Sequence, residues 1–174
     1  EGDPRRHRNA GLGVADRRGE AGREPEPAPI LGKPHEGIDS TLTILPHPPD
    51  KQIEIIREFG EVRPLTCRPG QLNQAFMNIL MNAVEAIVEK GKIIIATREE
   101  DGYVLIEICD TGKGISEDHL DRVFDPGFTT KGRGVGTGLG LPTAFRIIED
   151  HRGHIDITSD GANGTTVRVR IPAA

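Results

Sequence analysis

The chain has 174 residues, of which 22 are basic and 27 acidic, with a formal net charge of −5 and a pI of about 5.7. Aromatic residues make up 3% and tryptophan is absent, which argues against a nucleic-acid module built on aromatic stacking. The negative charge provides no global basic field for nucleic acid or an anionic membrane, and no apolar run approaches the ~20 residues of a membrane span. We therefore expect neither nucleic acid nor a membrane as a direct partner.

The cysteine content indicates a reducing compartment. Cys67 and Cys109 cannot build a disulfide framework and lack the spacing of a zinc site. We therefore predict a cytoplasmic domain, although a longer protein that contains it can still be anchored in a membrane.

The first 34 residues differ in composition from the rest of the chain. They contain five prolines, six glycines and thirteen charged residues, but only four large aliphatic residues. Such a segment buries too little apolar area to offset the entropy of ordering. We predict an unfolded tail or linker over residues 1–34 and one domain over residues 35–174. An interaction arm remains the alternative, because the tail holds a loose basic run: Arg5, Arg6, Arg8, Arg17 and Arg18.

From residue 35 onward the sequence becomes periodic. Weak alternation over Ser40–Leu45 predicts a strand that pairs with a second strand over Ile53–Phe59. A helix follows from Gln71 to about Lys90, and Gly91 is its expected C-terminal stop. The helix presents one apolar face at helical spacing: Leu72, Phe76, Ile79, Ala83 and Ile87.

Two hairpins and a second helix are predicted beyond Gly91. The first hairpin turns at Asp101-Gly102, a strong turn signal, and a long glycine-rich loop covers roughly residues 110–138. The strands and the helix are expected at Lys92–Glu99, Tyr103–Cys109, Leu139–His151, His154–Ser159 and Thr165–Ile171. In the second helix, the residues expected to face inward are Leu139, Ala144, Ile147 and Ile148.

A polar stripe lies opposite the apolar face of the first helix. Its members are Gln71, Gln74, Asn78, Asn82, Glu85 and Glu89. Asparagine is a poor helix former, and Asn78 and Asn82 are spaced to lie on one side of the helix. Carboxamide oxygens suit Mg²⁺ when phosphates supply the negative charge. An ordinary solvent-exposed face explains the stripe equally well at this point.

Asp110-Thr111-Gly112-Lys113-Gly114 follows the strand that ends at Cys109. The Asp110 side chain either caps this turn or accepts a hydrogen bond from a purine amino group. In the second case the two glycines allow the backbone to approach the base closely.

A run of alternating glycines precedes the second helix, at Gly132, Gly134, Gly136, Gly138 and Gly140. Their backbone N–H groups and the helix N-terminus together form an anion cradle. The spacing excludes a P-loop, and no strand precedes it as in a dinucleotide fingerprint. Lys131 and Arg133 lie in this loop, where they either meet a terminal phosphate or are ordinary surface charges.

The order of these motifs, with Phe124 and Phe128 before the glycine loop, resembles the ATP-binding catalytic domain of two-component sensor histidine kinases. The wider group includes DNA gyrase, heat-shock chaperone ATPases and mismatch-repair ATPases. The resemblance covers about residues 38–172. It implies an α+β fold of the Bergerat type: a two-layer sandwich whose mixed, mostly antiparallel sheet carries helices on one face.

The resemblance also implies a role for individual residues. It assigns Mg²⁺ to Asn82 with Asn78 beside it, adenine to Asp110 with Thr165, and a mobile lid to about residues 113–135. Phe124 and Phe128 match the aromatic motif. The further nucleotide-binding residues that it implies are Gly112, Gly114, Ile115, Thr129, Thr130, Lys131, Gly136, Thr137, Gly138, Leu139, Gly140 and Leu141.

The implied reaction is transfer of a phosphoryl group from ATP. Members of the group that hydrolyse ATP place a glutamate four residues before the Mg²⁺ asparagine, where this chain has Asn78, which cannot act as a base. We therefore expect slow hydrolysis, with Asn78 and Lys131 as the catalytic candidates and charge neutralisation by Mg²⁺ and Lys131.

The expected partners are ATP, a dimerisation domain that bears the acceptor histidine, in cis or in trans, and a response regulator. The family's acceptor pattern His-Glu-x-x-x-Pro is absent, because His35-Glu36 has no following proline and we predict no helix there. The chain therefore resembles an isolated domain, a fragment or a degenerate kinase. His151-x-x-His154 is expected to cap a helix end rather than bind metal. Two alternatives remain: a serine/threonine kinase of the anti-sigma type and a non-catalytic nucleotide-binding module.

Overall fold

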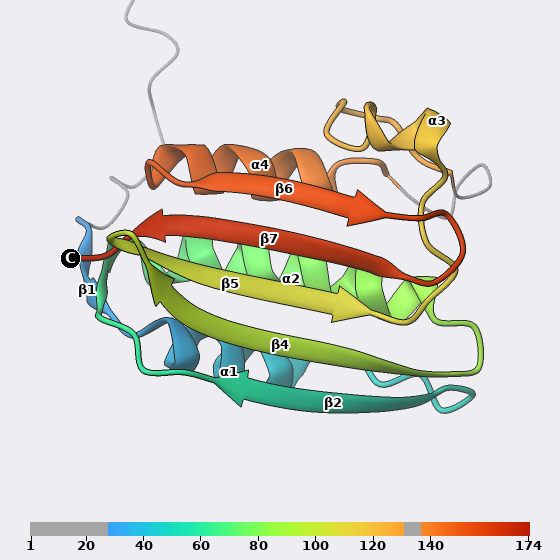
Figure 1. The fold of residues 1–174 in the computed structure, drawn as a ribbon, viewed down its shortest axis with the longest axis horizontal. Helices are drawn as coiled ribbons and strands as arrows, with labels where there is room; N and C mark the ends of the chain where they lie inside the picture. Colours follow the sequence, from blue (N-terminus) through green and yellow to red (C-terminus); the bar gives the residue numbers. More distant parts are fainter. Residues whose placement is uncertain (1–27, 131–136) are drawn as a thin grey trace, which may run out of the picture.

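The computed structural model describes residues 28–130 and 137–174, which form two layers (Figure 1). A five-stranded sheet makes one layer, and the helices α1, α2 and α4 cover one of its faces. The helices are α1 (Pro34–Ile44), α2 (Pro69–Ala86), α3 (Glu117–Leu120) and α4 (Gly140–Asp150). The strands are β1 (Ile30–Gly32), β2 (Gln52–Phe59), β3 (Leu65–Cys67), β4 (Lys90–Glu100), β5 (Tyr103–Asp110), β6 (His154–Ser159) and β7 (Thr165–Pro172).

The sheet has the strand order β2-β4-β5-β7-β6. β2 and β4 are parallel, and the other three neighbouring pairs are antiparallel. The prediction of a mixed, mostly antiparallel sheet with helices on one face is therefore confirmed. β1 and β3 form a separate antiparallel ribbon, so the predicted tail of residues 1–34 includes a strand and the first residue of α1. Residues 1–27 of that tail lie outside the described part.

The predicted strand over Ser40–Leu45 is wrong, because these residues belong to the end of helix α1 and the residue after it. Ile38, Leu42 and Leu45 are spaced by four and three residues, and all three are buried against the rest of the core. This helical spacing outweighs the weak local alternation. The prediction of no helix after His35-Glu36 is wrong for the same reason, and β2 pairs with β4 instead.

Helix α2 carries the predicted apolar face into the core between sheet and helices. It begins with a proline, which suits the first helical position, but it ends at Ala86 rather than near Lys90. Lys90 and Gly91 already belong to β4, where they pair with Gln52 and Ile53 of β2. Pairing with β2 therefore ends the helix early, and Gly91 is a strand residue rather than a helix stop.

Both predicted hairpins are confirmed. Asp101 and Gly102 have φ values of 51° and 80°, which form the tight turn between β4 and β5. β6 and β7 form the second hairpin. Helix α4 follows within one residue of its predicted start and end, but Leu139 does not face inward: it precedes the helix and is 51% exposed.

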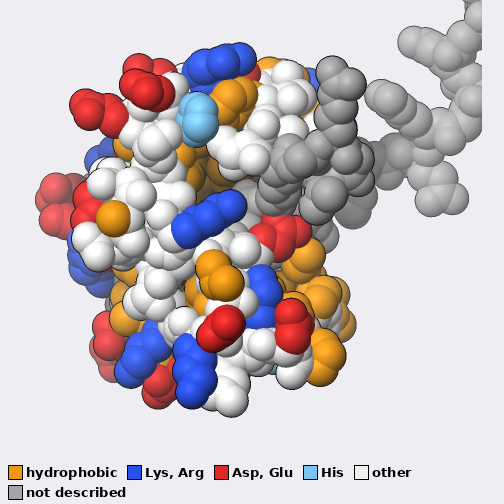
Figure 2. All heavy atoms as spheres, turned by 90° about the vertical axis from the view of Figure 1, so that its right-hand side faces the viewer, with side chains coloured by type: hydrophobic (Ala, Val, Ile, Leu, Met, Phe, Trp, Pro, Cys, Tyr) orange, Lys and Arg blue, Asp and Glu red, His pale blue; other side chains and the backbone are white. Residues whose placement is uncertain are grey.

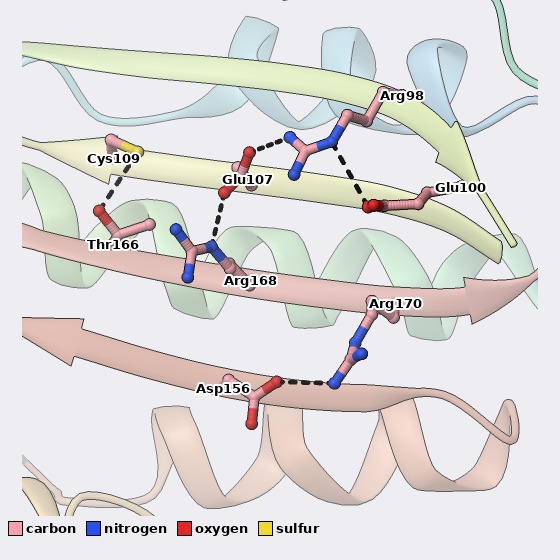
Figure 3. Close-up of polar contacts among 8 residues, drawn as sticks. All are labelled: Arg98, Glu100, Glu107, Cys109, Asp156, Thr166, Arg168 and Arg170. Atoms are coloured by element: carbon pink, nitrogen blue, oxygen red, sulfur yellow. Dashed lines mark hydrogen bonds and ion pairs between the residues drawn. The ribbon is translucent and has the colours of Figure 1, made fainter.

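The outer face of the sheet carries charged side chains in rows across the strands (Figure 3). Glu107 of β5 pairs with Arg98 of β4 and with Arg168 of β7, whose Nε lies 2.6 Å from Glu107 Oε1. Leu105 faces the same side and is only 4% exposed, because it lies in register between Arg98 and Arg170 and their aliphatic stems flank it. The face that no described helix covers is therefore polar, while the other face holds the core.

His151 joins the end of α4 to the start of α2. Its Nδ1 lies 2.7 Å from the carbonyl oxygen of Ile147, and its Nε2 accepts the backbone N–H of Arg68 at 3.0 Å. Both ring nitrogens are thus used within the protein, which confirms the predicted capping role for His151, whereas His154 is the exposed first residue of β6. Within residues 28–130 and 137–174, no helix is long and apolar enough to cross a membrane.

Candidate nucleotide-binding site

A cleft of about 660 Å³ opens at the end of the molecule where β5 ends and β7 begins. Figure 2 looks at this end, where the surface is hollowed and apolar side chains are visible inside the hollow. Helix α2, the ends of β5 and β7, the segment after β5 and the start of α4 all contribute walls. The residues predicted from the sequence that line it are Asn78, Asn82, Asp110, Gly114, Ile115, Phe128, Thr129, Thr130, Thr137, Gly138, Gly140, Leu141 and Thr165.

Asp110 is the buried acid of the cleft. It is the last residue of β5, and it is 8% exposed. Its Oδ1 accepts the backbone N–H of Gly112 at 2.8 Å, and its carboxylate also accepts the backbone N–H of Thr165. Burial raises the pKa of Asp110, and these two hydrogen bonds oppose the rise. The remaining acceptor capacity of the carboxylate is available to an amino group in the cleft.

The two glycines after Asp110 are required by close contacts. A Cβ at Gly112 would lie 2.6 Å from the backbone carbonyl of Ala86, at the end of α2. The next residue, Lys113, donates its backbone N–H to this carbonyl at 3.0 Å. Gly114 has a φ of 71°, which favours glycine. The motif thus fixes the end of β5 to the end of α2 and brings Asp110 and the asparagines of α2 to one cleft.

Asn78 and Asn82 are half-buried on the side of α2 that lines the cleft. Gly140, the first residue of α4, lies against Asn78, since a Cβ there would be 3.8 Å from the Asn78 Cβ. Gly138 has a φ of 64°, and its carbonyl accepts the backbone N–H of Gly127 at 3.0 Å. The cleft therefore has Asp110 at the end of β5, and carboxamides and glycine backbone near the start of α4.

Some predicted residues lie elsewhere. Gly112 is buried behind Asp110, and Leu139 is exposed outside the cleft lining. The aromatic pair divides: Phe128 lines the cleft, whereas Phe124 packs on Phe145 with ring centroids 5.0 Å apart. The other predicted site residues, Lys131 and Gly136, lie outside the described part of the chain, as do Gly132, Arg133 and Gly134. The last residues of the predicted lid, 131–135, therefore also lie outside it.

Two basic residues of the cleft were missed by the sequence analysis as binding candidates, Lys51 and Lys113. Lys51 precedes β2, and its Nζ donates to the carbonyl oxygen of Val84 at 3.0 Å. Nothing around Lys51 forms a motif, so only the packing of the segment before β2 against the end of α2 reveals it. Lys113 lies inside the Asp110 motif, and its spacing gives no signal that its side chain lines the cleft.

Comparison with known proteins agrees with this arrangement. Residues 67–174 match the family described as histidine kinase-, DNA gyrase B-, and HSP90-like ATPase, and the chain belongs to this family. Together with the relatives named below, this match confirms the resemblance to sensor histidine kinases. Sporulation kinase E of Bacillus subtilis (strain 168) is 42% identical over 122 residues, which cover 70% of this chain and 16% of that protein. Sensor histidine kinase ZraS of Escherichia coli (strain K12) is 40% identical over 104 residues, covering 60% of this chain and 22% of that protein.

Solved structures give the same result for the fold. The catalytic domain of histidine kinase ThkA, in a nucleotide-free form, superposes with a TM-score of 0.70 at 29% identity, covering 83% of this chain and 95% of that one. Full-length ShkA in complex with AMPPNP has a TM-score of 0.74 at 23% identity and covers 84% of this chain and 31% of that one. This chain spans less than a quarter of the two curated relatives, so it corresponds to one domain of much longer kinases.

Proposed function

We propose that this domain binds Mg-ATP and transfers the γ-phosphate to a histidine on a dimerisation element, in the same longer protein or in trans, for delivery to a response regulator. The observation that carries the proposal is the position of Asp110. Its buried carboxylate opens into the same cleft as Asn78 and Asn82. One cleft thus offers an acceptor for the adenine amino group and neutral oxygen ligands for the metal of a metal–phosphate complex.

The donor set of the cleft fits Mg²⁺. This cation prefers oxygen ligands, and the carboxamide oxygens of Asn78 and Asn82 provide them without adding negative charge beside the phosphates. When bound with ATP, Mg²⁺ neutralises charge on the transferred phosphoryl group. In our proposal Asn82 holds the metal, with Asn78 beside it, while the backbone of Gly138 and Gly140 and the side chain of Lys131 hold the phosphates.

The cleft favours transfer over hydrolysis. Activation of a water molecule needs a base, and the carboxamide of Asn78 cannot accept a proton at neutral pH. Glu85 lines the cleft one turn beyond Asn82 on the exposed rim. We therefore infer that hydrolysis is slow and that the acceptor histidine, rather than water, receives the phosphoryl group.

The test is incubation with γ-labelled ATP, alone and with a dimerisation hairpin of a sensor kinase supplied in trans. Acid-labile label is expected on the histidine of the hairpin and not on this chain, because this sequence has no His-Glu-x-x-x-Pro pattern. Asn82→Ala is expected to reduce the labelling at least 100-fold, because it removes the proposed metal ligand. Its circular dichroism spectrum controls for folding.

Each other result of this labelling experiment identifies a different function. Acid-stable label on a protein partner supports a serine/threonine kinase. Binding of ATP without transfer to any supplied acceptor supports a nucleotide-binding docking module. Strong acid-labile label on this chain alone contradicts the proposal that the acceptor lies on a separate element.

A further inference from the structure

Ser159, at the end of β6, connects two segments that border the cleft. Its hydroxyl donates to the carbonyl oxygen of Gly164 at 2.6 Å, across the loop between β6 and β7. The same oxygen accepts the backbone N–H of Ile115 at 2.9 Å, in the segment that follows the Asp110 motif. A longer contact of 3.4 Å brings the N–H of Gly161 to it as well.

These contacts use the full capacity of the hydroxyl. A serine hydroxyl has one proton to donate and two lone pairs to accept hydrogen bonds. Ser159 donates once, to Gly164, and accepts from Ile115 and Gly161. It is half-buried, and it lines a separate cavity of about 360 Å³ beside Asp110 and Thr165 rather than the 660 Å³ cleft. Ser159 therefore acts on the cleft through the segments that it holds rather than by contact with a ligand.

Both segments held by Ser159 touch the surroundings of Asp110. Gly164 packs so closely on the end of β5 that a Cβ there would lie 1.9 Å from the carbonyl oxygen of Asp110. The next residue, Thr165, donates its N–H to the Asp110 carboxylate. On the other side, a Cβ at Gly114 would lie 2.9 Å from Ser159 Oγ, so this glycine leaves room for the hydroxyl.

We propose that Ser159 is a positioning residue of the nucleotide site, which fixes the segment of Gly114 and Ile115 to the β6–β7 loop and thereby sets the adenine end of the cleft around Asp110. This inference rests on the proposed function, because it assigns adenine to Asp110. Loss of the hydroxyl frees Ile115 from its acceptor and Gly164 from its donor, while the asparagines of α2 keep their positions. The binding of adenine is weakened more than the binding of the phosphates.

The experiment measures the dissociation constants of Mg-ATP and Mg-GTP by titration calorimetry for the wild type and Ser159→Ala. Guanine carries a carbonyl oxygen where adenine carries its amino group, so GTP cannot use the Asp110 acceptor in the same way. We expect Ser159→Ala to raise the dissociation constant of Mg-ATP about tenfold and that of Mg-GTP less than twofold. Hydrogen exchange at the Ile115 amide is expected to become faster.

Ser40→Ala is the matched control. The Ser40 hydroxyl also donates to a backbone carbonyl, that of Glu36 at 2.7 Å, but it lies on α1, none of whose residues lines the cleft. This variant is expected to bind both nucleotides as the wild type does. If Ser159→Ala fails to fold, Ser159→Cys keeps the volume with a weak donor, and the same selective loss of ATP affinity is expected.

The outcomes separate the two claims. A wild type that does not bind Mg-ATP overturns the proposed function and this inference with it. A wild type that binds Mg-ATP, with a serine variant of equal affinity, overturns only the role of Ser159. An equal loss of ATP and GTP affinity also contradicts that role, because it indicates general loosening rather than positioning of the adenine end.

Discussion

Asp110 is an ionisable residue that the fold buries, although water solvates its carboxylate better than the protein interior does. Because burial raises its pKa, the folded state binds a proton more readily than the unfolded state. The stability linked to this group is therefore present below the unfolded pKa, and it is lost as the pH rises through the folded pKa. Ionisation of the carboxylate at this buried position therefore costs stability, and our proposal gives this cost a reason, because it assigns Asp110 to nucleotide binding.

Asp110→Asn tests this balance. The amide oxygen still accepts the backbone N–H of Gly112, and the buried charge is removed, so the melting temperature of the free domain at pH 7 is expected to rise. In the wild type, Mg-ATP at 100 times its dissociation constant should add about 2.7 kcal/mol, or roughly 5–11 °C for a domain of this size. The variant should lose most of this shift in a thermal melt, because the amide cannot bind the adenine amino group as a carboxylate does.

Asp156→Asn is the control for this prediction, since it makes the same substitution on the outer face of the sheet. It should keep the full nucleotide shift. An Asp110→Asn variant that retains the wild-type shift would contradict the placement of adenine at this carboxylate.

Glu107 shows the opposite linkage. Its hydrogen bond with Arg168 is the main cause that lowers its pKa, with Arg98 adding to the effect. The stability that it contributes is therefore present above the unfolded pKa and is lost as the pH falls through the folded pKa. Glu107 lies among half-exposed arginines, so solvent screening keeps the contribution small.

Glu107→Gln is expected to lower the free energy of unfolding by about 1 kcal/mol at pH 7. The difference from the wild type should shrink as the pH falls below the ordinary glutamate value of 4.5. Urea denaturation at pH 7 and pH 3 measures both. Glu54→Gln, which breaks an exposed pair with Lys92, should have almost no effect; a difference for Glu107→Gln that persists at pH 3 would exclude the charge as its cause.

At the scale of the elements, helix α2 receives its C-terminal cation from another part of the chain. Its last turn contains no basic residue, and Lys51 supplies the charge through its contact with the carbonyl of Val84. A cation at this end is favourable because the helix dipole is negative there. The same side chain lines the cleft, so Lys51 both donates to the end of α2 and adds a positive charge to the cleft.

Lys51→Met is expected to lower the free energy of unfolding by about 1 kcal/mol, because a helix carbonyl loses a charged donor. We also expect the dissociation constant of Mg-ATP to rise severalfold, because the cleft loses a cation. Chemical denaturation and titration calorimetry check the two effects. Lys33→Met removes a lysine from an exposed pair with Glu36 and should change neither; equal behaviour of the two variants would contradict the role of Lys51.

At the scale of the whole molecule, the fold depends on α1 as well as on the matched region from residue 67 onward. Ile38 is fully buried and Leu42 is 4% exposed, both in the core shared with α2 and the sheet. Truncation of one buried aliphatic side chain of this kind costs about 2–5 kcal/mol, against a total stability of about 5–15 kcal/mol. The folded unit therefore extends well before the start of the family match.

Deletion of residues 1–27 is expected to leave the melting temperature and Mg-ATP affinity unchanged, since their composition provides little apolar area for a core. Deletion of residues 1–44, which also removes β1 and α1, is expected to abolish cooperative unfolding, because the loss of α1 exposes one apolar side of α2. Calorimetric melts of the two truncated chains check both. A cooperative transition in the shorter chain would contradict the place of α1 in the core.

Local patterns in the sequence determined the elements that depend on neighbouring residues. The 3.6-residue period of the α2 core and the Asp101-Gly102 turn each specify their structure within a few residues. The resemblance to histidine kinases, which rests on the order of the Asn78/Asn82, Asp110 and glycine motifs, also implied which side chains gather, and the cleft contains most of them. The helical period and the turn depend only on residues that are close together in the sequence.

Only the tertiary structure decided the features that depend on distant partners. The segment 40–44 is helical because Ile38 and Leu42 are buried on a core formed mainly by residues beyond 60, and α2 ends at Ala86 because β4 pairs with β2. The roles of Lys51 and Ser159 arise from hydrogen bonds to residues 33 and 44 positions away in the sequence. Burial and backbone pairing between remote segments set these contacts, and no local period or spacing encodes them.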